Sequence, residues 1–311
     1  MAARQQLTDD VVMLTLRPSQ PEPVPPGSHL DLTIHAHSRR ERRSYSLVDL
    51  GQDDGLYRIC VRRRDTGRGG SVFMHSLAVG DAIETSVPVN GFPPSPGDAP
   101  ALLVAAGIGV TPMTGVARSL RARGVDYRLL CVVPAREQLP LADHLAALHG
   151  ERLIVHETRV LGRPVLADLI AGLPSDARLY VCGPLGLHHA AQAAWRTAHR
   201  SQVDFRCETF GDSGLLPTTA FEVRVRGRAD LIPVGVGATM LDALTDAGVP
   251  VLFDCLRGDC GLCAVDILEV DGTLDHRDLF FSAAQHETGR RMCACVSRVS
   301  GGSVTIDTGG R

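Results

Sequence analysis

The sequence predicts a multidomain protein that joins an antiparallel β-barrel, an α/β domain with a parallel sheet and a small mixed α/β domain. With 311 residues, the chain is too long for one ordinary hydrophobic core. Its first part carries short alternating segments, and its middle part alternates apolar strands with helical stretches. The third observation is that five of the nine cysteines fall within roughly the last 60 residues.

Composition is that of a soluble globular enzyme, with 44% hydrophobic and 22% charged residues. There is no apolar run of the roughly 18 residues that a membrane span needs, and the polar N-terminus lacks a secretory signal, so we expect a cytoplasmic protein without membrane association. A net charge of −3 without a basic tail argues against nucleic acid as a partner. All 32 basic residues are Arg, which excludes Schiff-base chemistry and lysine-dependent phosphate loops.

The first predicted domain, residues 1–98, is an antiparallel barrel of short strands separated by Pro, Gly and Asp. The expected strand segments are 11–18, 30–36, 45–50, 57–63 and 81–89. The Pro- and Gly-rich run 91–100 marks the domain boundary.

Residues 99–212 predict an α/β domain. The run 101–107 is almost continuously apolar, as in a buried parallel strand, and a stretch of helical spacing follows at 111–124. Three later strand signals have helical stretches between them: 127–133, 152–158 and 178–183. This alternation favours a parallel sheet covered by helices, and residues 213–220 are expected to form a linker.

Residues 221–311 predict a small mixed domain. A hairpin-like alternation over 221–235 precedes a helix over 240–248, a cysteine-rich loop, a strand over 264–270 and a final strand at 304–307.

The cysteine-rich loop carries the strongest chemical signal. Cys255, Cys260 and Cys263 have the plant-type spacing of a [2Fe–2S] cluster, in which three thiolates come from one loop and a fourth arrives from elsewhere. Zinc is the alternative, but zinc sites usually pair one CxxC with a second CxxC or with His. The fourth ligand is either Cys293 or Cys295, which lie two apart and would point the same way on a strand.

A second signal is a glycine pair after the first strand of the α/β domain. Gly107 and Gly109 let the backbone approach a pyrophosphate, and Thr111 and Pro112 open a helix whose N-terminus favours an anion. A second motif, 180–184, ends a later strand and would shape a nicotinamide pocket. Its candidate residues are Cys182, Gly183 and Pro184.

A third signal combines segments 42–47 and 59–71. A flavin needs an Arg for its phosphate, hydroxyl groups near its ring and a Gly-rich turn. The alternative is an Arg-rich solvated surface with a tight turn, and Cys60 also fits an inert core thiol. The candidate flavin-binding residues are Arg43, Tyr45, Ser46, Cys60, Val61, Arg62, Arg68, Gly69, Gly70 and Ser71.

These motifs occur in a recognisable order: RxYS at 43–46, GRGGS at 67–71, AGxGxTPM at 106–113, CGP at 182–184 and a C-terminal plant-type ferredoxin segment. The sequence resembles the phthalate dioxygenase reductase family, which also includes vanillate demethylase reductase, along essentially the whole chain. The resemblance implies an FMN-binding barrel, an NAD-binding α/β domain and a β-grasp ferredoxin domain. It further implies electron flow from NADH to FMN, to the cluster and then to a terminal oxygenase, of Rieske or haem-thiolate type.

The resemblance also implies particular residues. By the CVSR match at 295–298, Cys295 is the fourth iron ligand, and Glu208 and Phe210 are expected near the flavin ring. The GRGGS turn implies FMN, and the lack of an Arg at Pro134 favours NADH, although Arg136 is close. A cluster-based redox sensor and a free-standing NADH:flavin reductase are the alternatives from other functional classes.

Overall fold

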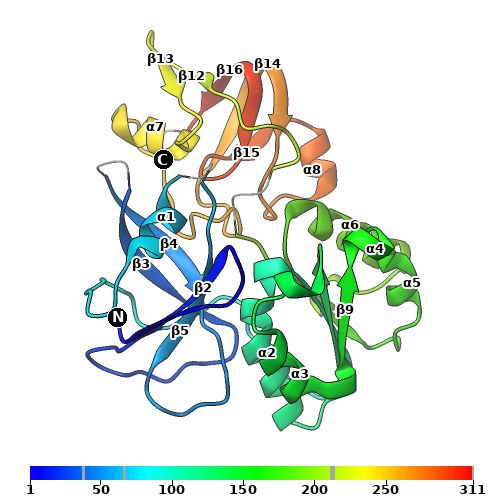
Figure 1. Ribbon diagram of the computed structural model, residues 1–311. Coiled ribbons are helices and arrows are strands. Elements are labelled where there is room, and N and C mark those ends of the chain that lie inside the picture. Colours follow the sequence, from blue (N-terminus) through cyan, green and yellow to red (C-terminus); the bar gives the residue numbers. More distant parts are fainter. Residues whose placement is uncertain (37–38, 66–67, 211–213, 310–311) are drawn as a thin grey trace. The chain divides into compact units, whose positions relative to one another are not determined.

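The computed structural model describes residues 1–36, 39–65, 68–210 and 214–309 (Figure 1). The chain divides into two compact units. The first holds Met1–Gly183 and Leu187–Glu208, and the second holds Pro184–Gly186 and Thr209–Arg311.

The N-terminal part of the first unit is barrel-like and is built from two antiparallel three-stranded sheets. One sheet has the order β1 (Ala3–Gln6), β2 (Val11–Leu16), β5 (Tyr57–Arg62), and the other has the order β4 (Arg39–Ser46), β3 (Ser28–Ala36), β6 (Val89–Asn90). A bridge between Leu47 and Ile59 joins them. Alternate residues of the strands point inward, so that Leu14, Leu32 and Ile59 are fully buried between the sheets.

One local expectation for the barrel is wrong. The segment 81–89 forms only an isolated bridge at Thr85 and the start of β6, because Pro88 has no N–H to give to a ladder. The Gly-rich turn leads directly into a helix that was not predicted, α1 (Gly70–Ser76), whose Met74 enters the barrel core.

The rest of the first unit is a five-stranded parallel sheet with the order β11-β10-β7-β8-β9. Its strands are β7 (Ala101–Ala106), β8 (Tyr127–Val133), β9 (Leu153–Glu157), β10 (Arg178–Cys182) and β11 (Phe205–Glu208). The helices are α2 (Val110–Ala122), α3 (Ala142–His149), α4 (Thr158–Leu161), α5 (Leu166–Ala171) and α6 (Leu185–Thr197). Helices α5 and α6 bury Ile170 and Trp195 against one face of the sheet, and Figure 1 shows α2 and α3 on the other side. This is a doubly wound arrangement.

The segment 91–100 is fixed rather than loose. The N–H of Ser95 donates to the Tyr180 hydroxyl at 2.7 Å, and its carbonyl accepts from Arg123 at 3.0 Å. Helix α2 also approaches the barrel closely, because a Cβ on Gly115 would lie 3.2 Å from the backbone nitrogen of Gly27. The barrel and the parallel sheet therefore form one packed unit, and the predicted boundary at 98/99 falls between β6 and β7.

The second unit contains a mixed five-stranded sheet with the order β13-β12-β16-β14-β15. Its strands are β12 (Phe221–Val225), β13 (Leu231–Val234), β14 (Ala264–Asp275), β15 (Arg291–Cys293) and β16 (Arg298–Asp307). Helix α7 (Met240–Asp246) begins with a capping box between Thr239 and Asp242 and buries Leu244 against the sheet. A second short helix, α8 (Ala283–Glu287), precedes β15.

The predicted linker 213–220 is in part attached to this second unit. The N–H of Leu215 donates to Asp275 at 3.1 Å, and Arg277 donates to the Thr218 hydroxyl at 3.0 Å. The predicted boundary at 212/213 lies outside the described residues. In the part of the chain that the structure describes, no helix is both long and apolar enough to cross a membrane.

Candidate functional site

The two predicted nucleotide motifs meet at the carboxyl ends of adjacent strands. β7 leads into the turn Gly107–Gly109, and β10 ends at Cys182 and leads into Gly183. A Cβ on Gly109 would lie 2.2 Å from the carbonyl oxygen of Cys182, so only glycine permits this approach. In a doubly wound sheet, this switch point between strands is where a dinucleotide binds.

The start of α2 is buried beneath this turn. The Thr111 hydroxyl donates to the carbonyl of Ile108 at 2.9 Å, and Pro112 sits in the first helical turn, where its missing N–H costs nothing. Both side chains are buried, so they shape the loop rather than face solvent. Pro184 is exposed and precedes α6.

His188 supports the second motif, a role that sequence reasoning did not assign. Its Nε2 donates to the carbonyl of Gly183 at 3.0 Å, and the residue is 2% exposed. Burial lowers the pKa of His188 to about 4, so the imidazole is neutral at pH 7. The only signal in the sequence is its place one turn after Pro184.

The predicted phosphate site brings Arg43 and the Gly-rich turn together. A Cβ on Gly70 would lie 3.3 Å from Nε of Arg43 and 2.9 Å from Ile34 Cδ1, which leaves no room for a side chain. Gly69 has φ 79°, the left-handed region that glycine adopts without strain. The Ser71 hydroxyl accepts from the N–H of Arg64 at 3.0 Å and so fixes the turn to the end of β5. Arg68 is half-buried at the start of this turn.

Strand β4 places the remaining polar candidates on two faces. Arg43 and Tyr45 pair across the ladder with Leu32 and Leu30, two core residues, and therefore face the barrel interior. Ser46 lies on the opposite face. Arg43 also forms an ion pair with Glu41, the next residue on the inner face.

The end of β5 connects the barrel with the nucleotide loop. A Cβ on Gly107 would lie 3.6 Å from Nη1 of Arg62, whose Nε binds Asp10 at 2.6 Å. The carbonyl of Val61 accepts from His75 of α1 at 2.9 Å. Burial raises the pKa of the Cys60 thiol to about 12, so this thiol stays protonated at pH 7.

The candidates that follow β10 are distributed over the two units. Glu208 ends β11 and is 3% exposed. Phe210 is half-buried and belongs to the second unit, so its place beside a flavin stays a prediction.

The cluster loop in the second unit is arranged for thiolates. The N–H groups of Arg257 and Asp259 donate to Cys255 Sγ, each at 3.4 Å. Together with hydrogen bonding from the Cys295 thiol, they lower the pKa of Cys255 to about 4. Hydrogen bonding from Cys293 and Cys295 lowers the pKa of Cys263 to about 3. This donor set fits an iron–sulfur cluster, whose sulfurs accept backbone hydrogen bonds.

Cys295 and Cys293 differ in their thiol partners. Cys295 hydrogen-bonds with both Cys255 and Cys263, which raises its own pKa. The pKa of Cys293 is raised most by its hydrogen bond with Cys263. Cys255 also raises the pKa of Cys293, but only through its charge and without a hydrogen bond. Cys295 is therefore the more central thiol, although both are buried.

Two glycines keep the cluster loop in place, because a Cβ on Gly258 or Gly261 would collide with Asp278 or with the Phe280 ring.

The fold and these sites define an oxidoreductase with a flavin-binding domain, a nucleotide-binding sheet and a [2Fe–2S] domain. Residues 1–92 match the oxidoreductase FAD-binding domain family, and residues 223–300 match the family of 2Fe-2S iron-sulfur cluster binding domains. The predicted fold class and the predicted [2Fe–2S] cluster are thereby confirmed.

Two curated relatives match almost end to end. The toluene-4-sulfonate monooxygenase system reductase subunit of Comamonas testosteroni is 33% identical over 316 residues, 99% of this chain and 97% of the relative. Phthalate dioxygenase reductase of Burkholderia cepacia is 30% identical over 319 residues, 99% of this chain and 96% of its own length. The chain belongs to the phthalate dioxygenase reductase family, as the motif order indicated.

Solved structures agree with this assignment. The structure of phthalate dioxygenase reductase, described as modular for electron transfer from pyridine nucleotides to [2Fe-2S], has a TM-score of 0.75 at 29% identity and covers 98% of this chain and 96% of that chain. A type IV self-sufficient cytochrome P450 monooxygenase has a TM-score of 0.66 at 32% identity, with 98% of this chain matching 40% of that longer chain.

Proposed function

We propose that this protein passes electrons from NADH through FMN and the [2Fe–2S] cluster to a separate terminal oxygenase. The observation that supports the proposal is the closeness of Arg62 to Gly107 within one packed unit, where a Cβ on Gly107 would lie 3.6 Å from the Arg62 guanidinium. If the candidate flavin surface and the candidate nucleotide loop are assigned correctly, this closeness suits hydride transfer from nicotinamide to flavin. A flavin accepts electrons in pairs from a nicotinamide and gives them singly to a two-iron cluster.

The residues of this chain supply binding and order rather than proton transfer. Gly107 and Gly109 would admit the pyrophosphate, Arg43 and the turn at Gly70 would bind the flavin phosphate, and the thiols of Cys255, Cys260, Cys263 and Cys295 would hold the cluster. No general acid or base is needed for electron transfer, and the site residues include none with a matching role.

FMN rather than FAD is supported by the compact phosphate site. Arg43 contacts Gly70 at the very start of α1, which suits a terminal phosphate. Flavin released by heat should co-migrate with FMN. Arg43→Ala should weaken flavin retention about tenfold or more, as expected for the loss of a charged hydrogen bond, whereas Arg128→Ala, an exposed change on β8, should not. Released FAD would show that the turn was misinterpreted.

A preference for NADH over NADPH is supported by Glu157, an acidic residue at the end of β9 that contacts the segment after β8. The N–H of Arg136 donates to the carboxylate of Glu157 at 3.0 Å. This carboxylate can accept a ribose hydroxyl and would repel a 2′-phosphate. The specificity constant should favour NADH by tenfold or more, on the order of the 1–3 kcal/mol of a charged hydrogen bond. Glu157→Gln should narrow this preference, and equal constants for NADH and NADPH in the wild type would reject it.

The proposed partner is a Rieske-type non-haem iron oxygenase. Support comes from the toluene-4-sulfonate monooxygenase and phthalate dioxygenase systems to which the two curated relatives belong. A haem-thiolate partner is the second candidate, because the P450 monooxygenase carries a similar module in its own chain. Reconstituted turnover with each class of oxygenase decides between them.

One experiment distinguishes the proposed electron carrier from a cluster-based sensor. Cytochrome c reduction by NADH should disappear in protein whose cluster has been removed, while flavin reduction stays intact. A cluster that is not reduced during turnover would instead favour the sensor. We propose a cytoplasmic location, because a reducing compartment keeps nine cysteines free, and two of them, Cys255 and Cys263, have a lowered pKa.

A further inference from the structure

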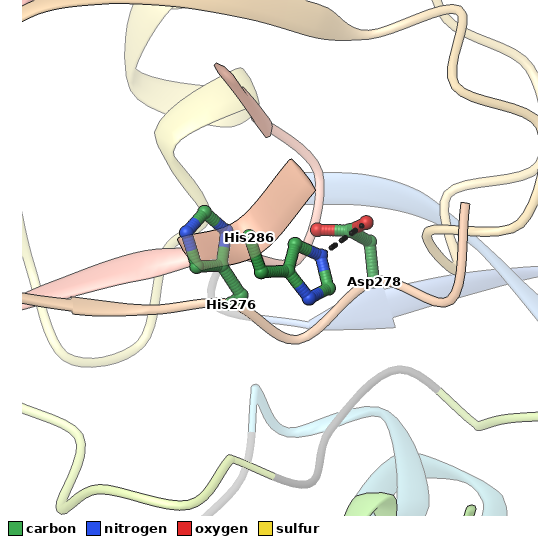
Figure 2. Close-up of side chains that lie close together, drawn as sticks. All are labelled: His276, Asp278 and His286. Carbon is green, nitrogen blue, oxygen red and sulfur yellow. Dashed lines mark hydrogen bonds and ion pairs between the residues drawn. The ribbon is translucent and has the colours of Figure 1, made fainter. Parts of the chain in front are cut away.

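Three polar side chains gather at the end of β14 in the second unit. His276, Asp278 and His286 bring one nitrogen or oxygen atom each to within 4.8 Å of one another (Figure 2). The two imidazole rings stack with a centroid separation of 4.3 Å and an interplanar angle of 15°. In-plane nitrogen lone pairs of stacked rings do not converge on one ion, so this arrangement favours a hydrogen-bonding role over metal binding.

The carboxylate of Asp278 is the centre of this group. It is fully buried and accepts hydrogen bonds at 3.0 Å from His286 Nε2, the N–H of Phe281 and the hydroxyl of Ser297. Burial alone would raise the pKa of Asp278, but these donors outweigh it and lower the pKa. The carboxylate therefore stays charged and holds three segments: its own loop, α8 and the stretch after Cys295.

The same loop holds the cluster ligands from the other side. The N–H groups of Leu279 and Phe280 both donate to the carbonyl of Gly258 at 3.1 Å. The Phe280 ring covers Gly261 so closely that a Cβ there would lie 2.3 Å from a ring carbon. Gly258 and Gly261 stand between Cys255 and Cys263, so the loop anchored by Asp278 contacts the backbone that presents three thiolates.

The serine end of the network reaches the fourth thiolate. Ser297 is two residues from Cys295, is 1% exposed, and its Oγ also accepts from the N–H of Arg277 at 3.1 Å. The segments 275–278 and 295–298 are thus joined directly through Asp278 and Ser297. One buried carboxylate links the three-ligand loop with the segment of the fourth ligand.

We propose that Asp278 is a positioning residue for the [2Fe–2S] cluster, which fixes the 255–263 loop against the Cys295 segment and places a buried negative charge beside the cluster. The proposal rests on the ligand set given above. A fixed negative charge disfavours the more negative, reduced cluster, and loosened ligand segments release iron more readily.

The test measures cluster content and redox potential rather than turnover. Asp278→Asn keeps the shape of the side chain but removes its charge. At a fixed applied potential, EPR should show a reduced-to-oxidised ratio raised on the order of tenfold, which is 59 mV for a one-electron couple. Iron loss to a chelator should also quicken. The matched control is Asp266→Asn, an exposed acid on β14 paired with Arg291, which should behave as wild type.

Ser297→Ala provides a milder second variant in case the ferredoxin unit of Asp278→Asn does not fold. It keeps the charge and removes one tether, so iron loss should quicken while the potential changes little; Ser300→Ala on β16 is its control. Wild-type iron release and potential in both Asp278→Asn and Ser297→Ala would overturn the proposal, as would a wild-type release rate in Ser297→Ala when Asp278→Asn does not fold. Wild-type protein lacking two irons and two sulfides would instead refute the ligand set.

Discussion

His188 shows how one buried side chain can make stability depend on pH. Its folded pKa of about 4 lies below the ordinary value of 6.5, so the unfolded chain binds a proton first as the pH falls. The stability is fully present above pH 6.5 and is lost between pH 6.5 and about 4. The loss amounts to up to about 3 kcal/mol for this group alone.

Thermal unfolding measured from pH 7.5 to 4.5 tests this. His188→Asn should flatten the fall in Tm, whereas His35→Asn, at an exposed site of the barrel, should leave it unchanged. His149 contributes a fall of its own, because burial lowers its pKa to about 4 as well. Equal slopes of Tm against pH in wild type and His188→Asn would show that the folded protein binds this proton as readily as the unfolded chain does.

The fourth iron ligand is a second question at the scale of single residues. Cys295 hydrogen-bonds with two of the other cluster thiols, and Cys293 with one. Cys293→Ser should keep the visible and EPR spectra of the cluster, and Cys295→Ser should lose or distort them. The reverse pattern would assign the ligand to Cys293.

Residue identities explain why the sequence could predict some of the site and not the rest. The 255–263 ligand loop is local, so its spacing alone indicated a cluster. The choice between Cys293 and Cys295 depends on sulfur contacts across the fold, which a period of two along a strand cannot distinguish. Glu157 and His188 were missed for a similar reason: each acts on a backbone group, Arg136 or Gly183, that the sequence gives no reason to select.

At the scale of elements, the approach of the β7 turn to the end of β10 is the tightest constraint on the nucleotide site. Gly109→Ala would place a Cβ 2.2 Å from the Cys182 carbonyl and push the two strand ends apart. A displacement near 1 Å can cost on the order of a hundredfold in rate. Stopped-flow reduction of the flavin by NADH should slow by about that factor, with flavin and cluster contents unchanged.

Gly172→Ala is the matched control, because its Cβ would make only an ordinary contact of 3.6 Å with Asp168 in the same sheet domain. An unchanged rate in Gly109→Ala would mean that the nicotinamide binds elsewhere.

Elements whose pattern comes from burial were the ones that the sequence could predict. The apolar runs of β7, β8 and β10 and the helical spacing of α2 all appear where expected. Segment 81–89 alternates like a strand, yet Pro88 and its position at an edge reduce it to a bridge and β6. Helix α1 was missed because Gly69 and Gly70, which favour turns, also begin it.

At the scale of the whole molecule, charge is distributed unevenly. Residues 220–311 carry 13 acidic side chains and 9 Arg, a net charge of −4 before any cluster is counted. Electrostatic attraction to a basic patch on the oxygenase should therefore speed encounter, with Asp254 and Asp259 beside the ligands as contributors.

Added salt should then slow electron delivery to the oxygenase, because the Debye length falls to about 3 Å at 1 M. Flavin reduction by NADH should stay nearly constant and is the internal control. If delivery does not respond to salt, docking is apolar, and the half-exposed Phe253, Leu262 and Phe280 become the residues to substitute.

The most direct test of the electron path is EPR of the holoprotein mixed anaerobically with NADH. The spectrum of a reduced [2Fe–2S] cluster should appear with NADH, and it should fail to appear in protein from which the flavin has been removed. A cluster that stays oxidised while the flavin is reduced would contradict the proposed electron path, as would a cluster that NADH reduces without any flavin.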